Sequence, residues 1–303
     1  MPRAFVVLSA ALLVVLLGAP AGSAAGRAGL AAPGEKEIAM ELVSSAENST
    51  LDWRREYGYI EDIGDGRGYT AGLIGFCSGT GDMLQLVRSY AAAEPRAPLA
   101  GFVPALRRVD GTASHRGLGA PFVAAWRRAA RDPVFRRLQM RELDRVYFDP
   151  AVRRAKADGL GTLGQFVYYD AIVMHGPGQD SSSFGGIRRR AMAAARTPAQ
   201  GGSEVTYLEA FLDVRRAQME SEAEHGDTSR IDDEQLRFLR EGNLALRPPL
   251  VWHTYGDRYA IGRLIDARSG AGAAVIAWSE MAREGPAIAA VETFLGGAVT
   301  PLA

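Results

Sequence analysis

The chain has 303 residues, of which 47% are hydrophobic, so it contains enough apolar side chains to bury a sizeable core. Its 35 basic and 35 acidic residues give a formal net charge of zero, and these totals do not suggest a nucleic-acid partner. The single cysteine, Cys77, excludes an intramolecular disulfide. Its apolar surroundings favour a buried structural thiol over a nucleophile.

The first 25 residues have the layout of a secretory signal peptide. Arg3 supplies a positive charge, residues 4–19 form an apolar run, and small residues up to Ala25 offer a cleavage site. The run is shorter than the roughly 20 residues that a membrane-spanning helix needs. We therefore predict a secreted, extracellular protein that has no membrane contact once the signal peptide is removed.

The next segments predict a helix followed by a small sheet. Residues 37–46 place their apolar side chains on one helical face. Residues 57–63 and 70–76 are rich in aromatic and β-branched side chains, which favours two antiparallel strands joined by the glycine-rich turn at 64–68. Glu47 then falls in the last turn of the helix, and Asp65 falls in the turn of the sheet.

Beyond residue 82 the pattern is mainly helical. The Asp-Pro pairs at 132–133 and 149–150 are predicted to interrupt this helical region. Residues 160–174 are apolar on nearly all sides, which predicts a central buried helix. Residues 176–203 are predicted to be rich in loops, and residues 204–243 to be helical again.

Together these elements predict an α+β fold that is mainly α-helical. We expect two lobes with a cleft between them, and a small antiparallel β-sheet in the minor lobe. Residues 262–303 are rich in alanine and glycine, and they are treated as a C-terminal extension without an assigned structure or role.

Two carboxylates in different surroundings suit the hydrolysis of a glycosidic bond. One must stay protonated as the acid, and the other must stay ionised as base or nucleophile. Glu47 and Asp65 are the candidates. Taken alone, each also has an ordinary interpretation, as a solvated helix-end glutamate and as an aspartate that stabilises a tight turn. The four histidines are scattered without the i, i+4 spacing of a metal site, so neither metal nor cofactor is predicted.

The segments around both carboxylates resemble the secreted bacterial chitosanases of glycoside hydrolase family 46. They read IAMELVSSAEN at 38–48 and IGDGRGYT at 63–70. Further similar blocks follow in the same order: GFCSGTGD at 75–82, RVYFDP at 145–150, YYDAIVMHGPG at 168–178, RTPAQGG at 196–202, DTSR at 227–230 and TYGD at 254–257. The resemblance implies a lysozyme-like catalytic domain at residues 26–261.

This resemblance implies endo-acting hydrolysis of the β-1,4 bonds between glucosamine units of chitosan, with inversion of configuration. Glu47 would be the general acid and Asp65 the general base, while Thr70 helps to hold the attacking water. Other matching positions would line the substrate: Asp82, Glu222, Tyr59, Arg67, Tyr147 and His175. An ionic network of Asp170, Arg215 and Arg230 would support Glu47.

Two alternatives remain open at this stage. A related lysozyme-like glycosidase could act on chitin or peptidoglycan, although neutral N-acetylated sugars would not need the carboxylates of Asp82 and Glu222. A non-catalytic secreted carbohydrate-binding protein is less compatible with a mainly helical chain that keeps both carboxylates. We expect a monomer whose partner is the chitosan polysaccharide.

Overall fold

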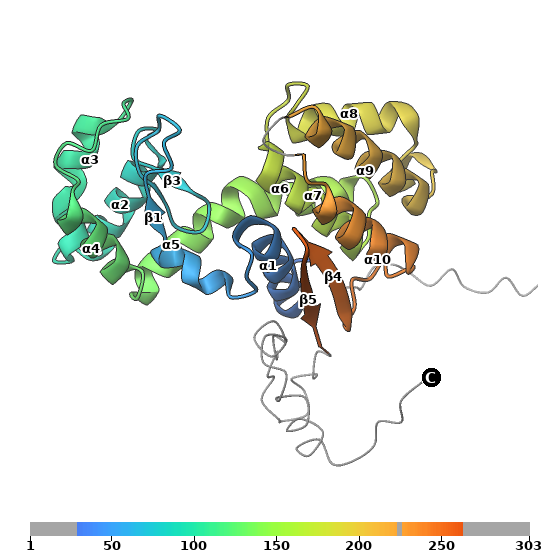
Figure 1. The fold of residues 1–303 in the computed structure, drawn as a ribbon, viewed down its shortest axis with the longest axis horizontal. Helices are drawn as coiled ribbons and strands as arrows, with labels where there is room; N and C mark the ends of the chain where they lie inside the picture. Colours follow the sequence, from blue (N-terminus) through green and yellow to red (C-terminus); the bar gives the residue numbers. More distant parts are fainter. Residues whose placement is uncertain (1–28, 223–225, 263–303) are drawn as a thin grey trace, which may run out of the picture.

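A computed structural model describes residues 29–222 and 226–262, which form two lobes joined by a long helical segment (Figure 1). The predicted signal peptide lies outside the described residues, and so does the predicted extension except for its first residue, Gly262. The described chain is mainly helical with two small antiparallel sheets, which confirms the predicted α+β class.

The minor lobe contains a three-stranded sheet packed against short helices. Its strands pair antiparallel in the order β1-β2-β3, with Thr70 opposite both Glu61 and Cys77. The elements of this lobe are β1 Ile60–Glu61, β2 Thr70–Ala71, β3 Phe76–Cys77, α2 Asp82–Ala93, the 3₁₀ turn η2 Pro98–Phe102, α3 Val103–Val109 and α4 Ala120–Ala129. Its core is built from aromatic side chains, with Trp126 fully buried against Phe76, Phe122 and Phe135.

The major lobe is a group of helices around α7, which is buried along most of its length. A two-stranded hairpin, β4-β5, packs within the same lobe (Figure 1). The elements are α1 Pro33–Asn48, the 3₁₀ helix η1 Trp53–Gly58, α6 Asp149–Ala157, α7 Thr162–His175, α8 Phe184–Ala194, the 3₁₀ turn η4 Pro198–Gln200, α9 Glu204–Glu220, η5 Arg230–Gln235, α10 Leu236–Arg240, β4 Leu250–Thr254 and β5 Asp257–Ile261. The predicted buried helix at 160–174 is thereby confirmed as α7.

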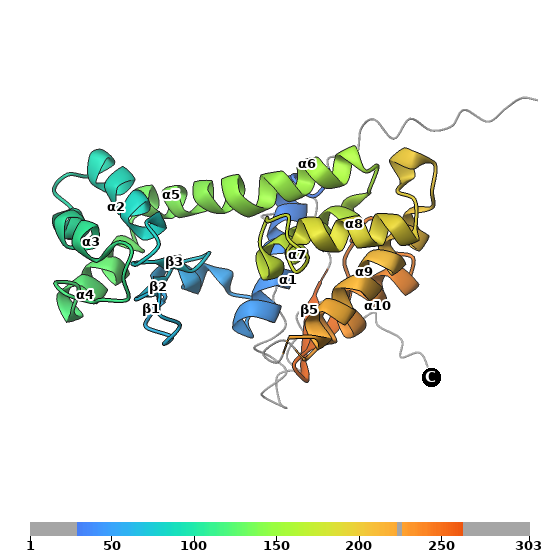
Figure 2. The ribbon, with the colours of Figure 1, turned by 90° about the horizontal axis from the view of Figure 1, so that it is seen from above.

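The connection between the lobes corrects one prediction. Helix α5 (Pro133–Leu143) passes through a π-helical turn, η3 (Asp144–Phe148), directly into α6, as Figure 2 shows. The Asp149-Pro150 pair therefore does not break the helix. The Asp149 N–H donates to the Asp144 carbonyl, so the backbone hydrogen bond spans five residues instead of four. This shift comes just before Pro150, which has no N–H to donate.

Two further predictions need correction. The strands of the first sheet are much shorter than predicted, because Tyr57 belongs to the 3₁₀ helix η1 and residues 72–75 form a turn between β2 and β3. Helix α8 lies inside the segment that was predicted to be loop-rich. Its Gly185-Gly186 pair suggests a break, but Gly186 instead allows close packing, since a Cβ there would collide with the backbone oxygen of Asp180.

Cys77 is buried in strand β3, as predicted, with its sulfur 3.6 Å from the Thr70 hydroxyl. Within the described ranges, no helix combines the length and the apolar character needed to cross a membrane.

Helix α1 carries a buried acid whose titration affects stability. Glu41 is 5% exposed and its Oε2 has no hydrogen-bond partner among the described residues. Burial, together with the nearby charge of Glu37, raises the pKa of Glu41 from 4.5 to about 7. The folded protein therefore keeps a proton that the unfolded chain releases.

We predict that this proton makes stability fall as the pH rises from about 4.5 to about 7. Replacing the acid (Glu41→Gln) removes the titration, so the variant should gain ~1–3 kcal/mol relative to wild type at pH 8 and almost nothing near pH 4.5. Urea unfolding across this pH range measures the effect, with Glu209→Gln on the exposed face of α9 as the matched control. Parallel stability curves for wild type and Glu41→Gln would contradict the prediction.

Candidate active site

Glu47 stands at the end of α1, beside a pocket between the lobes. The helix ends at Asn48, and Ser49 adopts a left-handed conformation with a φ of 51°, which turns the chain toward η1. The Glu47 side chain is 38% exposed, so its carboxylate is accessible from solvent.

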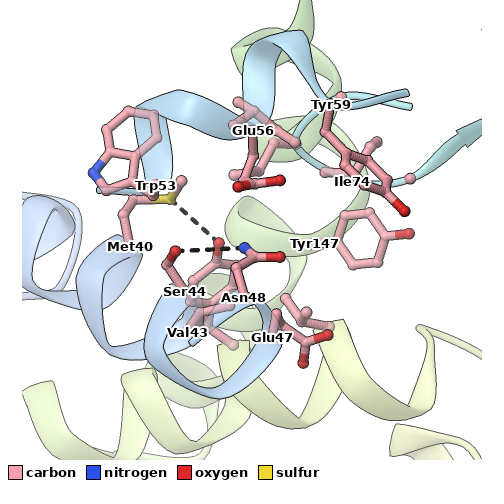
Figure 3. A pocket seen from close by; sticks show the side chains of 16 residues that line it. Met40, Val43, Ser44, Glu47, Asn48, Trp53, Glu56, Tyr59, Ile74 and Tyr147 are labelled. Carbon is pink, nitrogen blue, oxygen red and sulfur yellow. Dashed lines mark hydrogen bonds between the residues drawn. The ribbon is translucent and has the colours of Figure 1, made fainter. Parts of the chain in front are cut away.

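The pocket has a volume of about 250 Å³ and takes its lining from several elements of both lobes. Helix α1 contributes Glu47 and Asn48, η1 contributes Trp53 and Glu56, and the β2–β3 turn contributes Ile74 (Figure 3). Polar groups therefore lie beside apolar and aromatic ones. Such a mixed lining is typical of sites that bind a sugar ring through its faces and its edge groups.

A buried ionic network forms an ion pair with the Glu47 carboxylate. A single guanidinium nitrogen of Arg230, Nη2, lies 2.8 Å from Glu47 Oε1 and 2.6 Å from Asp170 Oδ1. Asp170 Oδ2 is also 2.7 Å from Arg215 Nη1. Both arginines and Asp170 are at most 3% exposed, so Glu47 is the one carboxylate bound to Arg230 that is also accessible to solvent.

Asp170 in this network stays ionised over a wide pH range. Burial alone would raise the pKa of Asp170, but the charges of Arg230 and Arg215 outweigh it and hold that pKa well below its ordinary value. The structure thus brings Asp170, Arg215 and Arg230 together with Glu47. The role of the three residues in positioning the acid stays a prediction.

Two members of this cluster were not anticipated from the sequence. Gln235 donates from Nε2 to Asp170 Oδ2 at 2.7 Å and accepts from Arg215 Nη1 at 3.0 Å. Glu234 is fully buried with both carboxyl oxygens unpartnered among the described residues, and burial followed by the charge of Asp170 raises its pKa well above the ordinary value. Both belong to the π-helical turn η5, whose widened spacing has no sequence signature.

Asp65 lies in the minor lobe, in the exposed turn between β1 and β2. Arg67 holds it through three contacts: its backbone N–H donates to Oδ1 at 2.9 Å, while Nε at 2.8 Å and Nη2 at 2.6 Å meet Oδ2. The side-chain hydrogen bond from Arg67 lowers the pKa of Asp65 below its ordinary value. Asp65 is therefore ionised at any pH near neutrality, as a general base requires.

Thr70 and Asp82 lie close to each other in the same lobe. Thr70 is buried in β2, next to Cys77. Asp82 begins α2 and directs one oxygen, Oδ1, to three donors: the backbone N–H groups of Cys77 and Met83 and the hydroxyl of Thr80. These bonds fix the carboxylate of this exposed residue, and its Oδ2 has no hydrogen bond from the described residues.

Tyr147 lies near predicted site residues of both lobes, Glu47 in the major lobe and Asp82 and Arg67 in the minor lobe. It lines the pocket together with Glu47 and Tyr59. Burial raises the pKa of Tyr147, and the charges of Asp82, Arg67 and Glu47 also act on it, so its phenol lies within electrostatic reach of both lobes' site residues.

The remaining two predicted residues lie on the major lobe and do not line this pocket. His175 ends α7 and its Nε2 accepts a hydrogen bond from Arg215 Nε at 3.3 Å, so it contacts the buried network. Glu222 follows α9 and accepts from Gln218 Nε2 at 2.9 Å.

Tyr255 is a further residue that sequence reasoning missed. It is 49% exposed in the β4–β5 turn, where Tyr255 and Gly256 both have positive φ. Burial of part of the ring raises its pKa, and the charges of Arg230 and Glu47 also act on it. An exposed aromatic ring within electrostatic reach of Glu47 is suited to stack on a sugar. No cluster of three or more potential metal ligands occurs within 29–222 and 226–262.

A mainly helical, two-lobed molecule with a helix-end glutamate in an interlobe pocket and an aspartate on a small sheet is a lysozyme-like glycoside hydrolase. A model of glycosyl hydrolase family 46 matches residues 41–250, and the chain belongs to this family.

Similar curated proteins and solved structures agree with this assignment. A chitosanase of Streptomyces sp. (strain N174) is 68% identical over 234 residues, which are 77% of this chain and 84% of that protein. A chitosanase of Nocardioides sp. (strain N106) is 60% identical over 80% of this chain and 87% of its own length. A chitosanase co-crystallised with substrate superposes with a TM-score of 0.72 at 57% identity, over 78% of this chain and 99% of the other. A Gynuella sunshinyii chitosanase in complex with chitotetraose gives 0.66 at 33% identity, over 74% and 96%.

We predict that the network couples stability to activity. Arg215→Ala removes one of two cations from a buried carboxylate, which should lower the unfolding free energy by ~3–5 kcal/mol and reduce turnover, because Arg230 then loses its fixed position against Glu47.

A matched control is Arg188→Ala, which breaks the partly buried pair with Asp158 without touching the network. Melting temperature and chitosan turnover are measured on both variants. The control should lose stability alone, whereas a stable Arg215→Ala protein with normal turnover would show that the network does not act on the site.

Proposed function

We propose that this protein is a secreted, endo-acting chitosanase that hydrolyses β-1,4 bonds between glucosamine units with inversion of configuration. The observation that supports it best is Glu47, a solvent-accessible carboxylate fixed by Arg230 at the edge of a pocket between the lobes. Relatives that are 68% and 60% identical over the aligned 234 and 244 residues are named chitosanases.

In this mechanism Glu47 donates a proton to the oxygen of the scissile bond. Asp65, kept ionised by Arg67, removes a proton from the attacking water, and Thr70 helps to orient that water. An inverting enzyme needs about 6.5–9.5 Å between the two carboxyl groups so that a water molecule fits between base and sugar. Glu47 lies on the major lobe and Asp65 on the minor lobe, so the two carboxyl groups would act on the bound sugar from different lobes.

The polymer would bind as a polycation. Asp82, with one free carboxylate oxygen, and Glu222 would bind the amines of individual sugar units, while Tyr59, Arg67, Tyr147 and His175 line the path of the chain. We further propose residues 1–25 as the signal peptide, residues 26–261 as the catalytic domain, and a monomer that needs no cofactor.

The first test is the release of reducing ends from highly deacetylated chitosan by wild type and by Glu47→Gln. The variant cannot donate the proton, so we expect its rate to fall by about 10²–10⁴-fold while the protein stays folded. Fully acetylated oligomers serve as the comparison substrate. A folded wild type that leaves chitosan intact, or that prefers the acetylated oligomers, would refute the proposal in favour of chitin or peptidoglycan. Polymer binding without cleavage would indicate a binding protein instead.

The acid side of the pH profile tests the assignment of the base. Arg67 holds the pKa of Asp65 below 3.8, so wild-type activity should persist to low pH. Replacing this cation (Arg67→Met) should move the acidic limb of the kcat/KM profile upward, toward the ordinary pKa of an aspartate. An acidic limb at the same pH in both proteins would show that another group than Asp65 controls it.

A further inference from the structure

One carboxylate of the pocket has no part in the mechanism above. Glu56 belongs to the 3₁₀ helix η1 and lines the pocket together with Glu47, Asn48 and Tyr147. Figure 3 shows its carboxylate directed into the pocket, on the side of Tyr59 and Trp53. A residue of this kind faces whatever part of the substrate enters the pocket.

The Glu56 carboxylate has no hydrogen bond or ion pair with the described residues, although the Glu56 backbone carbonyl accepts from the Tyr59 N–H. Burial raises the pKa of Glu56, the neighbouring charge of Asp52 raises it further, and Arg55 only partly opposes these effects. Arg55 itself is paired with Asp52 at 2.9 Å. Glu56 is therefore a half-buried carboxylate without an oppositely charged partner among the described residues, and a cation bound in the pocket would stabilise its charge.

The position of Glu56 differs from that of the amine-binding residues already considered. Asp82 and Glu222 do not line this pocket. Tyr147 does line it, and the charges of Asp82, Arg67 and Glu47 all act on that phenol. Tyr147, Glu47 and Glu56 line the same pocket, so a sugar unit bound there beside Tyr147 and Glu47 also lies beside Glu56.

The size and lining of the pocket suit a single sugar unit. Its volume of about 250 Å³ is below the roughly 300–1,000 Å³ of pockets that hold drug-sized ligands. Apolar surface comes from Trp53, Leu73 and Tyr169, against which the face of a pyranose ring can pack. Glu56 then supplies the acidic group that a charged substituent of this ring requires.

We propose that Glu56 binds the 2-ammonium group of the glucosamine unit in this pocket, and so makes the enzyme select a deacetylated sugar there. This inference rests on the proposed chitosanase function and adds one specific subsite to it. Glu56 acts on binding alone, through a charge-assisted hydrogen bond from the ammonium group to its carboxylate. N-acetylation removes the positive charge and adds bulk, so an acetylated unit gains nothing from this residue.

The test compares wild type, Glu56→Gln and the control Glu209→Gln, an exposed glutamate of α9 outside the pocket. Steady-state kinetics are measured on chitosan of low and of intermediate acetylation. For Glu56→Gln we expect KM on the highly deacetylated polymer to rise about three- to tenfold, while kcat stays within about twofold of wild type. The ratio of kcat/KM on the highly deacetylated polymer to kcat/KM on the more acetylated one should fall by the same factor. The control should match wild type on both substrates.

A binding measurement makes the result independent of turnover. In the Glu47→Gln background, calorimetry with glucosamine hexamer should show weaker binding when Glu56→Gln is added. The loss should disappear at high salt, where an ion pair is screened.

The outcomes separate the two proposals. If the wild-type protein does not cleave chitosan, both the proposed function and this inference are wrong. A wild type that cleaves, with unchanged KM and hexamer affinity in Glu56→Gln, overturns the inference alone. A fall in kcat at unchanged KM would also overturn it, because it would assign Glu56 to proton transfer.

Discussion

The site depends on Arg230, whose guanidinium lies between two carboxylates of opposite exposure. Asp170 is 1% exposed and Glu47 is 38% exposed, and one nitrogen of Arg230 contacts both. Two cations and a buried anion are expensive to desolvate, and they persist only because each satisfies another. Helices α1, α7 and α9 and the π-turn η5 supply Glu47, Asp170, Arg215 and Arg230, so the packing of the major lobe also determines the position of the Glu47 carboxylate.

The minor lobe holds the other carboxylate, Asp65, ionised and exposed to water. Asp65 lies in a turn whose flanking glycines, Gly64 and Gly66, have φ of 75° and 81°, a conformation that residues with a Cβ rarely adopt. Arg67 then holds the carboxylate from within the same turn. Glu47, the proposed acid, is thus fixed by a buried network, and Asp65, the proposed base, by a local exposed one. Each lobe delivers one of the two carboxylates in the surroundings its proposed task requires.

The sequence allowed much of this to be predicted, for reasons that differ by residue. The apolar run around Asp170 made its burial predictable, and burial required a cationic partner; the resemblance then named Arg215 and Arg230. The small sheet was predictable from its glycine-rich turn, although the strands were predicted too long. The continuity of α5 and α6 was not predictable, because the rule that proline interrupts helices does not anticipate a π-turn that removes the need for its N–H. Glu56 was missed because a glutamate between Arg55 and Tyr57 reads as solvated surface until the pocket is seen.

The only thiol of the chain also reports on its dynamics. Cys77 is 1% exposed and lies in the strand that pairs with Thr70, so a thiol reagent reaches it only when this part of the sheet opens. Its labelling rate in native buffer therefore measures the local opening of the minor lobe, without an engineered probe and without a second cysteine to confuse the signal. If binding of the polymer holds the minor lobe closed, the labelling rate of Cys77 will fall in its presence, so this one sulfur atom reports whether binding restrains the lobe.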